Sequence, residues 1–220
     1  MADAEIPQPA KEPAVSDVSL PQSRPTLDAI RGRHSVRVFT EQAIGEEDLW
    51  AILDAANRAP SAHNQQSWRF IILRNQKKHE LAELVSQRAN DFPRPSSILL
   101  RMAARSILSA PVVVAVANTG ELIRHGSELF QVDKDLARDF FRTMEIQSSA
   151  AAVENLLLAA TSMGIGSVWL GILFLIKQEV LTFLGEPEGE FMAVVPIGYP
   201  ARTTEGPKKR PLDAIVKHLD

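Results

Sequence analysis

Apolar residues recur at helical spacing in several stretches of the chain. In residues 46–58, Leu49, Ile52, Leu53 and Ala56 fall at positions i, i+3, i+4 and i+7, which places them on one face of a helix. Acidic residues fill the first turn of this stretch, where they favour the positive end of the helix dipole. Patterns of this kind predict helices over residues 26–30, 46–58, 76–90, 97–108, 135–163 and 177–184.

Three apolar runs predict β-strands. Residues 111–118 (PVVVAVAN) are nearly continuous in apolar and β-branched residues, which is typical of a strand buried on both faces. Residues 68–73 and 191–198 are the other expected strands. The stretch 135–163 has no internal proline or glycine and predicts one long, mostly buried helix. Few strands and several helices together predict an α+β or α/β sandwich.

The first 25 residues differ from the rest of the chain. They contain five of the 14 prolines, carry a net charge of −2 and lack a basic start followed by an apolar segment. We therefore expect a disordered, proline-rich extension over residues 1–25, followed by one folded domain over residues 26–220. The most apolar stretch, residues 164–176, has 13 residues and is too short to span a bilayer. A cytoplasmic protein that does not enter the membrane is expected.

Composition narrows the possible chemistry. The chain has 220 residues, a net charge of −3 and no cysteine. Without cysteine there can be no thiolate nucleophile, iron–sulfur cluster or cysteine-based zinc site, and no two of the five histidines have the i, i+4 spacing of a helical metal site. The negative net charge disfavours a protein that binds nucleic acid, even through local basic clusters.

Residues 31–37 (RGRHSVR) combine three arginines with a serine and a histidine. In an extended chain Arg33, Ser35 and Arg37 lie on one side, where guanidinium forks and a hydroxyl can bind phosphate oxygens. The alternative is a solvated basic loop. A second basic cluster, residues 207–210 (PKKR), becomes functional only if it joins the first around one phosphate.

Two further segments could contact a planar ligand. Residues 60–68 form a polar loop in which Asn64, Gln65 and Gln66 offer amides that donate and accept hydrogen bonds, as a heterocycle edge requires, although a simple polar turn would look the same. Residues 163–171 (MGIGSVWLG) are rich in glycine but follow a helix, whereas a dinucleotide fingerprint follows a strand. These glycines either end the long helix or let the backbone approach a ligand.

In order along the chain, these segments resemble the nitroreductase family of FMN-dependent oxidoreductases. Four motifs carry the resemblance, which covers about residues 26–217: RHSVRVF at 33–39, APSAHNQQSW at 59–68, GIGSVWLG at 164–171, and GYP at 198–200 followed by PKKR at 207–210. One position departs from the family pattern, because Ser67 stands where the family has proline before the tryptophan.

The resemblance implies an α+β sandwich with a central, mostly antiparallel sheet flanked by helices, in an intertwined homodimer with FMN at the interface. Five residues would bind the phosphate and ribityl side of FMN, namely Arg33, His34, Ser35, Lys208 and Arg210. Arg37 would support the flavin electrostatically near N1. The flavin ring would be contacted by Pro60, Ser61, Asn64, Gln66, Leu170 and Gly171.

The resemblance also implies the reaction. NAD(P)H would reduce the flavin, and a nitroaromatic, quinone or related small acceptor would then take the hydride in a ping-pong cycle. No catalytic acid or base and no metal is implied, and stretches around residues 90–107 and 120–142 would determine the substrate. The alternatives are a specialised member that fragments flavin or removes halogen, and a flavin-binding module without catalysis.

Overall fold

The computed structural model describes residues 24–129 and 132–219. The predicted disordered extension therefore lies almost wholly outside the described residues and stays a prediction. Its last residue, Pro25, opens helix α1 (Pro25–Gly32), where proline suits the first helical position because its missing N–H has no acceptor there.

A four-stranded sheet forms the centre of the fold. Its strands are β1 (Trp68–Leu73), β2 (Val112–Asn118), β3 (Gly166–Ser167) and β4 (Glu190–Gly198), arranged in the order β1-β2-β4-β3 with antiparallel neighbours throughout. Strand β2 is buried along its whole length, as its β-branched run predicts. In the β2–β4 ladder Ala115 pairs with Val194.

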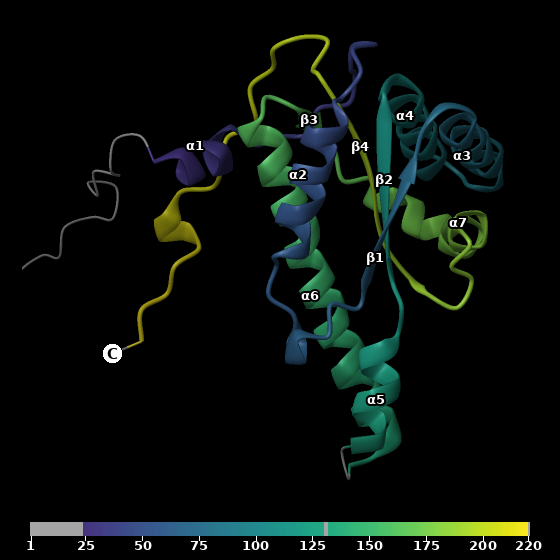
Figure 1. Ribbon diagram of the computed structural model, residues 1–220, viewed down its shortest axis with the longest axis vertical. Coiled ribbons are helices and arrows are strands. Elements are labelled where there is room, and N and C mark those ends of the chain that lie inside the picture. The colour runs from purple at the N-terminus through teal and green to yellow at the C-terminus, as the bar shows by residue number, and fades with distance from the viewer. Residues whose placement is uncertain (1–23, 130–131, 220) are drawn as a thin grey trace, which may run out of the picture.

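Helices cover both faces of this sheet (Figure 1). On one face lie α2 (Glu46–Asn57) and α6 (Lys134–Ser162), and on the other lie α3 (Asn75–Arg88), α4 (Ser96–Ser109) and α7 (Lys177–Leu184). Val112, Val114 and Val116 point into the first layer, whereas alternate residues of the same strand point into the second. The predicted α+β sandwich with a mostly antiparallel sheet is confirmed.

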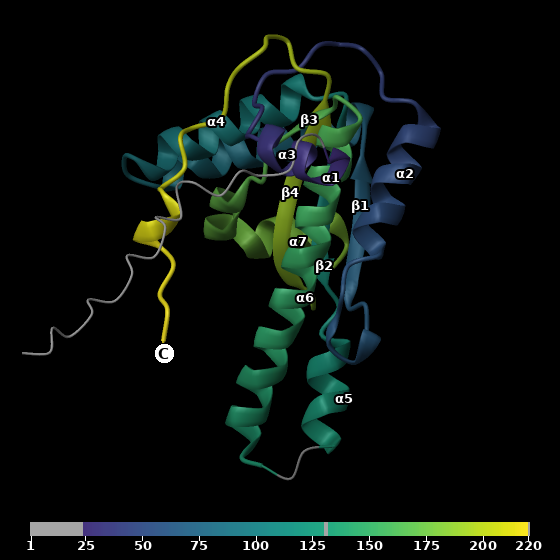
Figure 2. The ribbon, with the colours of Figure 1, turned by 90° about the vertical axis from the view of Figure 1, so that its left-hand side faces the viewer.

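The predicted helices are present with boundaries shifted by one or two residues, and one additional helix emerges. Helix α5 (Glu121–Leu129) pairs with the first half of α6, and the two project from the sheet as a hairpin (Figures 1 and 2). Asp133 caps α6 by accepting hydrogen bonds from the amides of Asp135 and Leu136. No helix in the described part of the chain has the length and apolarity needed to cross a membrane.

The segment that follows α1 is extended and lies beside the end of the sheet. The Val36 amide donates to the Ser167 carbonyl at 2.9 Å, and the Thr40 amide donates to the Tyr199 carbonyl at 2.8 Å. Val36 is buried against Gly166, where a Cβ atom would come within 2.8 Å of the Val36 Cβ. Glycine at 166 therefore lets the basic segment pack directly against β3.

Candidate functional site

A basic pocket of about 470 Å³ lies between this extended segment and the chain after β4. Two stretches line it, residues 33–38 on one side and Arg202, Thr204, Glu205, Pro207 and Lys209 on the other. Four of these side chains are cationic and only one is a carboxylate, so the pocket is positively charged. Such a pocket is suited to an anion with several oxygens, such as a phosphate.

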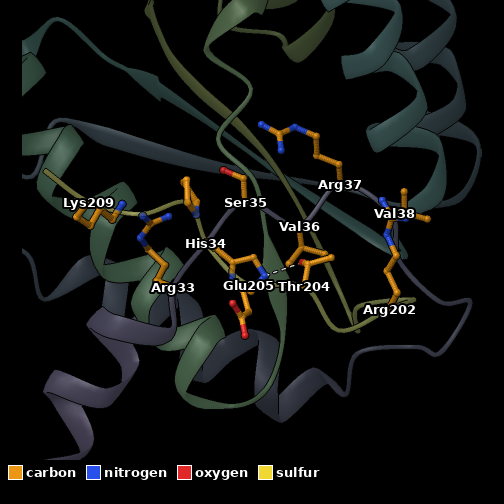
Figure 3. A pocket seen from close by; sticks show the side chains of 11 residues that line it. Arg33, His34, Ser35, Val36, Arg37, Val38, Arg202, Thr204, Glu205 and Lys209 are labelled. Atoms are coloured by element: carbon orange, nitrogen blue, oxygen red, sulfur yellow. Dashed lines mark hydrogen bonds between the residues drawn. The ribbon is translucent and has the colours of Figure 1, made fainter.

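The residues of the extended segment alternate as the sequence predicts. Arg33, Ser35 and Arg37 project to one side, and Val36 between them is buried (Figure 3). Arg33 Nε lies 3.7 Å from a Glu154 carboxylate oxygen on α6, a loose ion pair between partly exposed groups. Among the described residues, the other side-chain donors of Arg33 have no hydrogen-bond partner. The segment therefore presents two guanidinium groups and a hydroxyl to the pocket.

His34 points away from that side and is held by protein groups at both ring nitrogens (Figure 3). Nδ1 lies 2.9 Å from the Gly32 carbonyl and Nε2 lies 3.0 Å from the Thr204 hydroxyl. A carbonyl only accepts, so Nδ1 donates, and in the neutral ring Nε2 accepts from Thr204. His34 thus ties the extended segment to the chain after β4.

The second basic cluster reaches the pocket through a residue that the sequence did not single out. Lys209 lines the pocket, whereas the predicted phosphate ligands Lys208 and Arg210 are exposed and do not line it in this chain. Arg202, on the same stretch, also lines it. Only the path of the chain after β4 determines which cations face inward, and local sequence does not specify that path.

An apolar groove of about 260 Å³ lies next to the basic pocket. Arg37 lines both cavities, and among the described residues it is the only charged residue of the groove. The remaining lining comes from α4 and from the glycine-rich turn: Leu99, Met102, Ala103, Ser106, Val168, Trp169, Leu170, Gly171 and Ile172. The structure therefore brings the predicted residues Arg37, Leu170 and Gly171 together at one cavity.

Leu170 and Gly171 differ in the hydrogen bonds that they can still make. The Leu170 amide donates to the Val194 carbonyl at 2.9 Å and is therefore engaged. Gly171 opens the 3₁₀ helix η4 (Gly171–Ile176), so its amide has no acceptor within the helix. Apart from its two chain neighbours, a Cβ atom on Gly171 would meet no atom of the described residues within 4 Å, which leaves space for a ligand above the backbone.

The predicted ring-binding residues Pro60, Ser61, Asn64 and Gln66 form a third group, which we call the amide loop. The loop lies near α5, at the opposite end of the sandwich from β3 and the basic pocket (Figure 1). Gln66 donates from Nε2 to the Asn64 side-chain oxygen at 3.0 Å, and its backbone amide donates to the Ser61 hydroxyl at 3.1 Å. Within one chain this loop does not meet the other predicted site residues.

The amide loop holds an unusual backbone conformation. The φ angles of His63, Asn64 and Gln66 are 54°, 53° and 51°. These values lie in the left-handed region, which residues other than glycine rarely adopt. Such strain is kept where the surrounding structure imposes it and is frequent at binding sites. The side-chain amides of Asn64 and Gln66 are consequently preorganised.

Comparison with known proteins gives a consistent result. The nitroreductase family model matches residues 30–199. A protein of Archaeoglobus fulgidus that carries the double name NADH dehydrogenase/NAD(P)H nitroreductase is 31% identical over 179 residues, which are 79% of this chain and 84% of that protein. The 5,6-dimethylbenzimidazole synthase of Rhodospirillum rubrum is 29% identical over 188 residues, 82% of this chain and 84% of the synthase.

Solved structures also match. A Bacteroides fragilis nitroreductase with bound FMN superposes with a TM-score of 0.68 at 27% identity, covering 90% of this chain and 100% of that one. The Vibrio harveyi NADPH:FMN oxidoreductase in complex with NAD⁺ gives a TM-score of 0.71 at 21% identity, covering 90% and 78% of the two chains, a likeness of fold.

Proposed function

The chain belongs to the nitroreductase family, and on that premise we propose that it is an FMN-dependent oxidoreductase that uses NAD(P)H to reduce a small acceptor. The single observation that carries the proposal is the position of Arg37. This residue lines both a basic pocket that fits a phosphate and an apolar groove that fits a ring. FMN combines these two chemical characters in one molecule.

The basic pocket fits the phosphate end of FMN. Arg33 and Lys209 lie on one side of the pocket and Ser35 stands above it (Figure 3). Guanidinium and ammonium groups would neutralise the phosphate, and the Ser35 hydroxyl would donate one further hydrogen bond. Lys208 and Arg210 are exposed in one chain and do not line the pocket. They would bind the phosphate only if a second chain changed their surroundings.

The groove fits the flavin ring. Its walls are apolar, its one charge is Arg37, and the Gly171 amide is free to donate toward a ring nitrogen. FMN bound here would supply the hydride chemistry, and the fixed charge of Arg37 would favour its reduced form by stabilising negative charge on the ring. Leu99 and Met102 would form an apolar wall, against which NAD(P)H and the acceptor would bind in turn.

We propose that a second copy of the chain completes each site. The amide loop is preorganised for a ring edge but lies far from the groove of its own chain, so a partner's loop would supply Asn64 and Gln66 (Figure 1). The chain after β4 supports the dimer, because residues 200–219 are exposed and include apolar side chains that need a cover.

A specialised reaction is the second candidate. The likeness to a 5,6-dimethylbenzimidazole synthase favours it, as does Ser67 at the position of the family proline. In that case the site would bind FMN in the same way but turn over slowly with ordinary acceptors.

The test is reconstitution of the purified protein with FMN. We expect a yellow protein whose visible flavin absorbance is bleached by NADH or NADPH without oxygen and restored by a quinone or nitroaromatic. A protein that stays colourless would refute the proposal. FMN binding without bleaching by either nicotinamide would leave a flavin-binding module, and a new flavin-derived product in air would identify the specialised reaction.

A further inference from the structure

A cluster of buried polar side chains lies beneath the amide loop and outside both cavities. Glu145, Ser148 and Ser149 occupy positions i, i+3 and i+4 of α6 and therefore share one helix face. All three are buried. Polar groups of this kind are expensive to bury in a core, so their contacts require an explanation.

Each of these side chains holds a different segment. The Ser148 hydroxyl accepts from the Ala62 amide at 3.1 Å and so fixes the amide loop. The Ser149 hydroxyl donates to the side-chain oxygen of Asn118, at the end of β2. Glu145 Oε1 accepts from the Leu122 amide at 2.8 Å and so caps the first turn of α5.

Glu145 is the least compensated member of the cluster. It is 0% exposed, and Oε2 has no hydrogen-bond partner among the described residues. Burial raises the pKa of its carboxyl, against the opposing effects of the Leu122 and Ile123 amides and of the Ser67 hydroxyl beside it. The carboxyl therefore interacts with α5 on one side and with the end of the amide loop on the other.

The charged groups around Glu145 do not neutralise it. Glu190 on β4 raises the pKa of Glu145 further by charge repulsion, and Arg142, one turn away on α6, is engaged in an ion pair with Glu190. The other titratable or charged groups on the neighbouring segments are Glu121, Arg124, His125 and Glu128 on α5 and His63 on the amide loop. None of these groups forms an ion pair with Glu145 among the residues that the structure describes.

We propose that Glu145 is a positioning residue of the flavin site, which couples the start of α5 to the amide loop through Leu122 and Ser67 and loosens that loop when it ionises. The inference rests on the proposed FMN site. The neutral carboxyl is compatible with its dry surroundings, whereas a carboxylate there draws in water and separates the elements packed around it. The positions of Asn64 and Gln66 then become less defined, and FMN binds more weakly.

The position of Ser67 gives the coupling its specificity. Ser67 is 3% exposed, its carbonyl accepts from the Thr119 amide at 2.8 Å, and its hydroxyl lies beside Glu145. A proline at this position, as the family pattern has it, has no hydroxyl to offer. The departure from the pattern therefore becomes the link between a buried acid and the loop.

The experiment compares Glu145→Gln with Glu128→Gln, a control on the exposed side of α5. The FMN dissociation constant of the wild type and both variants is measured from the ordinary glutamate pKa of 4.5 up to about pH 8.5, with amide hydrogen exchange of residues 59–67 in the FMN-free protein. Glutamine keeps an acceptor for the Leu122 amide but cannot ionise. As pH rises, the FMN affinity of the wild type and of Glu128→Gln should therefore fall roughly three- to tenfold relative to that of Glu145→Gln. Exchange of the loop should accelerate over the same range only in these two proteins.

Superimposable pH profiles of FMN affinity and loop exchange in the wild type and Glu145→Gln would overturn the inference. If the wild type binds no FMN, the proposed function fails, and the exchange measurement still decides whether Glu145 controls the loop. Ser67→Ala provides the second variant: it should reduce the pH dependence of the loop but keep that of the α5 amides. Equal pH dependence in Ser67→Ala and the wild type would exclude the link through Ser67.

Discussion

His34 illustrates how a residue can serve a binding site without offering a free nitrogen to the ligand. Both of its ring nitrogens already have protein partners, Gly32 two residues before it in the chain and Thr204 170 residues after it. Lys209 lies on the chain that this contact holds, so its position at the pocket depends on His34. The structure therefore favours a positioning role for His34, in addition to the phosphate contact that the family resemblance implies.

A double-mutant cycle tests that role. We expect His34→Ala and Thr204→Val each to raise the FMN dissociation constant, because either change frees the chain that carries Lys209. The double variant should be no weaker than the worse single one, with a coupling energy of about 1 kcal/mol. Titration of FMN fluorescence measures all four proteins, and additive losses would contradict the contact.

Arg33 should contribute directly to phosphate binding. Arg33→Ala removes a charge-assisted hydrogen bond, worth about 1.5–3 kcal/mol, so the FMN dissociation constant should rise roughly ten- to hundredfold. Arg31→Ala is the matched control, since Arg31 pairs with Asp28 on α1 and does not line the pocket. Riboflavin, which lacks the phosphate, should bind both variants and the wild type equally, and a loss of riboflavin affinity in Arg33→Ala would argue against a phosphate contact.

The sequence predicts some residue positions and not others, for a physical reason. The two-residue period of an extended chain correctly places Arg33, Ser35 and Arg37 on one side. It does not select Lys209 among three consecutive cations, because that choice depends on contacts with His34, far away in the sequence. Glu145 escapes detection as well, since an acid in a long helix normally faces solvent.

Among the elements, those with strong local patterns were predictable. The β2 run and the long α6 helix appear close to their expected limits. Strand β3 has only two residues and exists because it pairs with β4, so no periodicity reveals it. Helix α5 depends on tertiary contacts, namely the Glu145 cap and the close packing of Gly126 on Phe141.

The glycine-rich turn contains one glycine that packing requires, Gly166, and one that is proposed to approach the ligand, Gly171. Gly166→Ala places a methyl group 2.8 Å from the Val36 Cβ, so the free energy of unfolding should fall by about 1–3 kcal/mol. Gly171→Ala places it in open space, so stability should change by less than about 0.5 kcal/mol while FMN affinity drops. Urea unfolding and FMN titration distinguish the two, and equal FMN affinity in Gly171→Ala and the wild type would place the flavin elsewhere.

The buried Glu145 in the α5–α6 hairpin should make the free energy of unfolding depend on pH. The folded state raises the pKa of Glu145 above its ordinary value of 4.5, so the unfolded chain releases this proton at lower pH than the folded chain. The free energy of unfolding should therefore fall, relative to Glu145→Gln, as pH rises from that ordinary value through the raised one. Urea unfolding across this range measures the difference, which would be constant with pH if Glu145 titrated normally.

At the scale of the whole molecule, the groups proposed to bind one FMN lie at opposite ends of the sandwich. The basic pocket and the groove lie near β3, whereas the amide loop lies near α5 (Figure 1). In the proposed site, a single chain would bind the phosphate but would leave the ring edge without Asn64 and Gln66. Flavin affinity and dimerisation should consequently be linked, each strengthening the other.

Shortening the chain tests this linkage. A variant that ends at Arg210 keeps every lining residue of the basic pocket but loses the exposed apolar side chains Leu212, Ile215, Val216 and Leu219. If these side chains cover a partner, each contributes about 1 kcal/mol, and the dimer dissociation constant should rise at least about a hundredfold. FMN affinity should fall with it at low protein concentration and recover at high concentration, because mass action restores the two-chain site. Light scattering with FMN titration over a concentration series measures both, and a shortened chain that binds FMN equally at every concentration would show that one chain suffices.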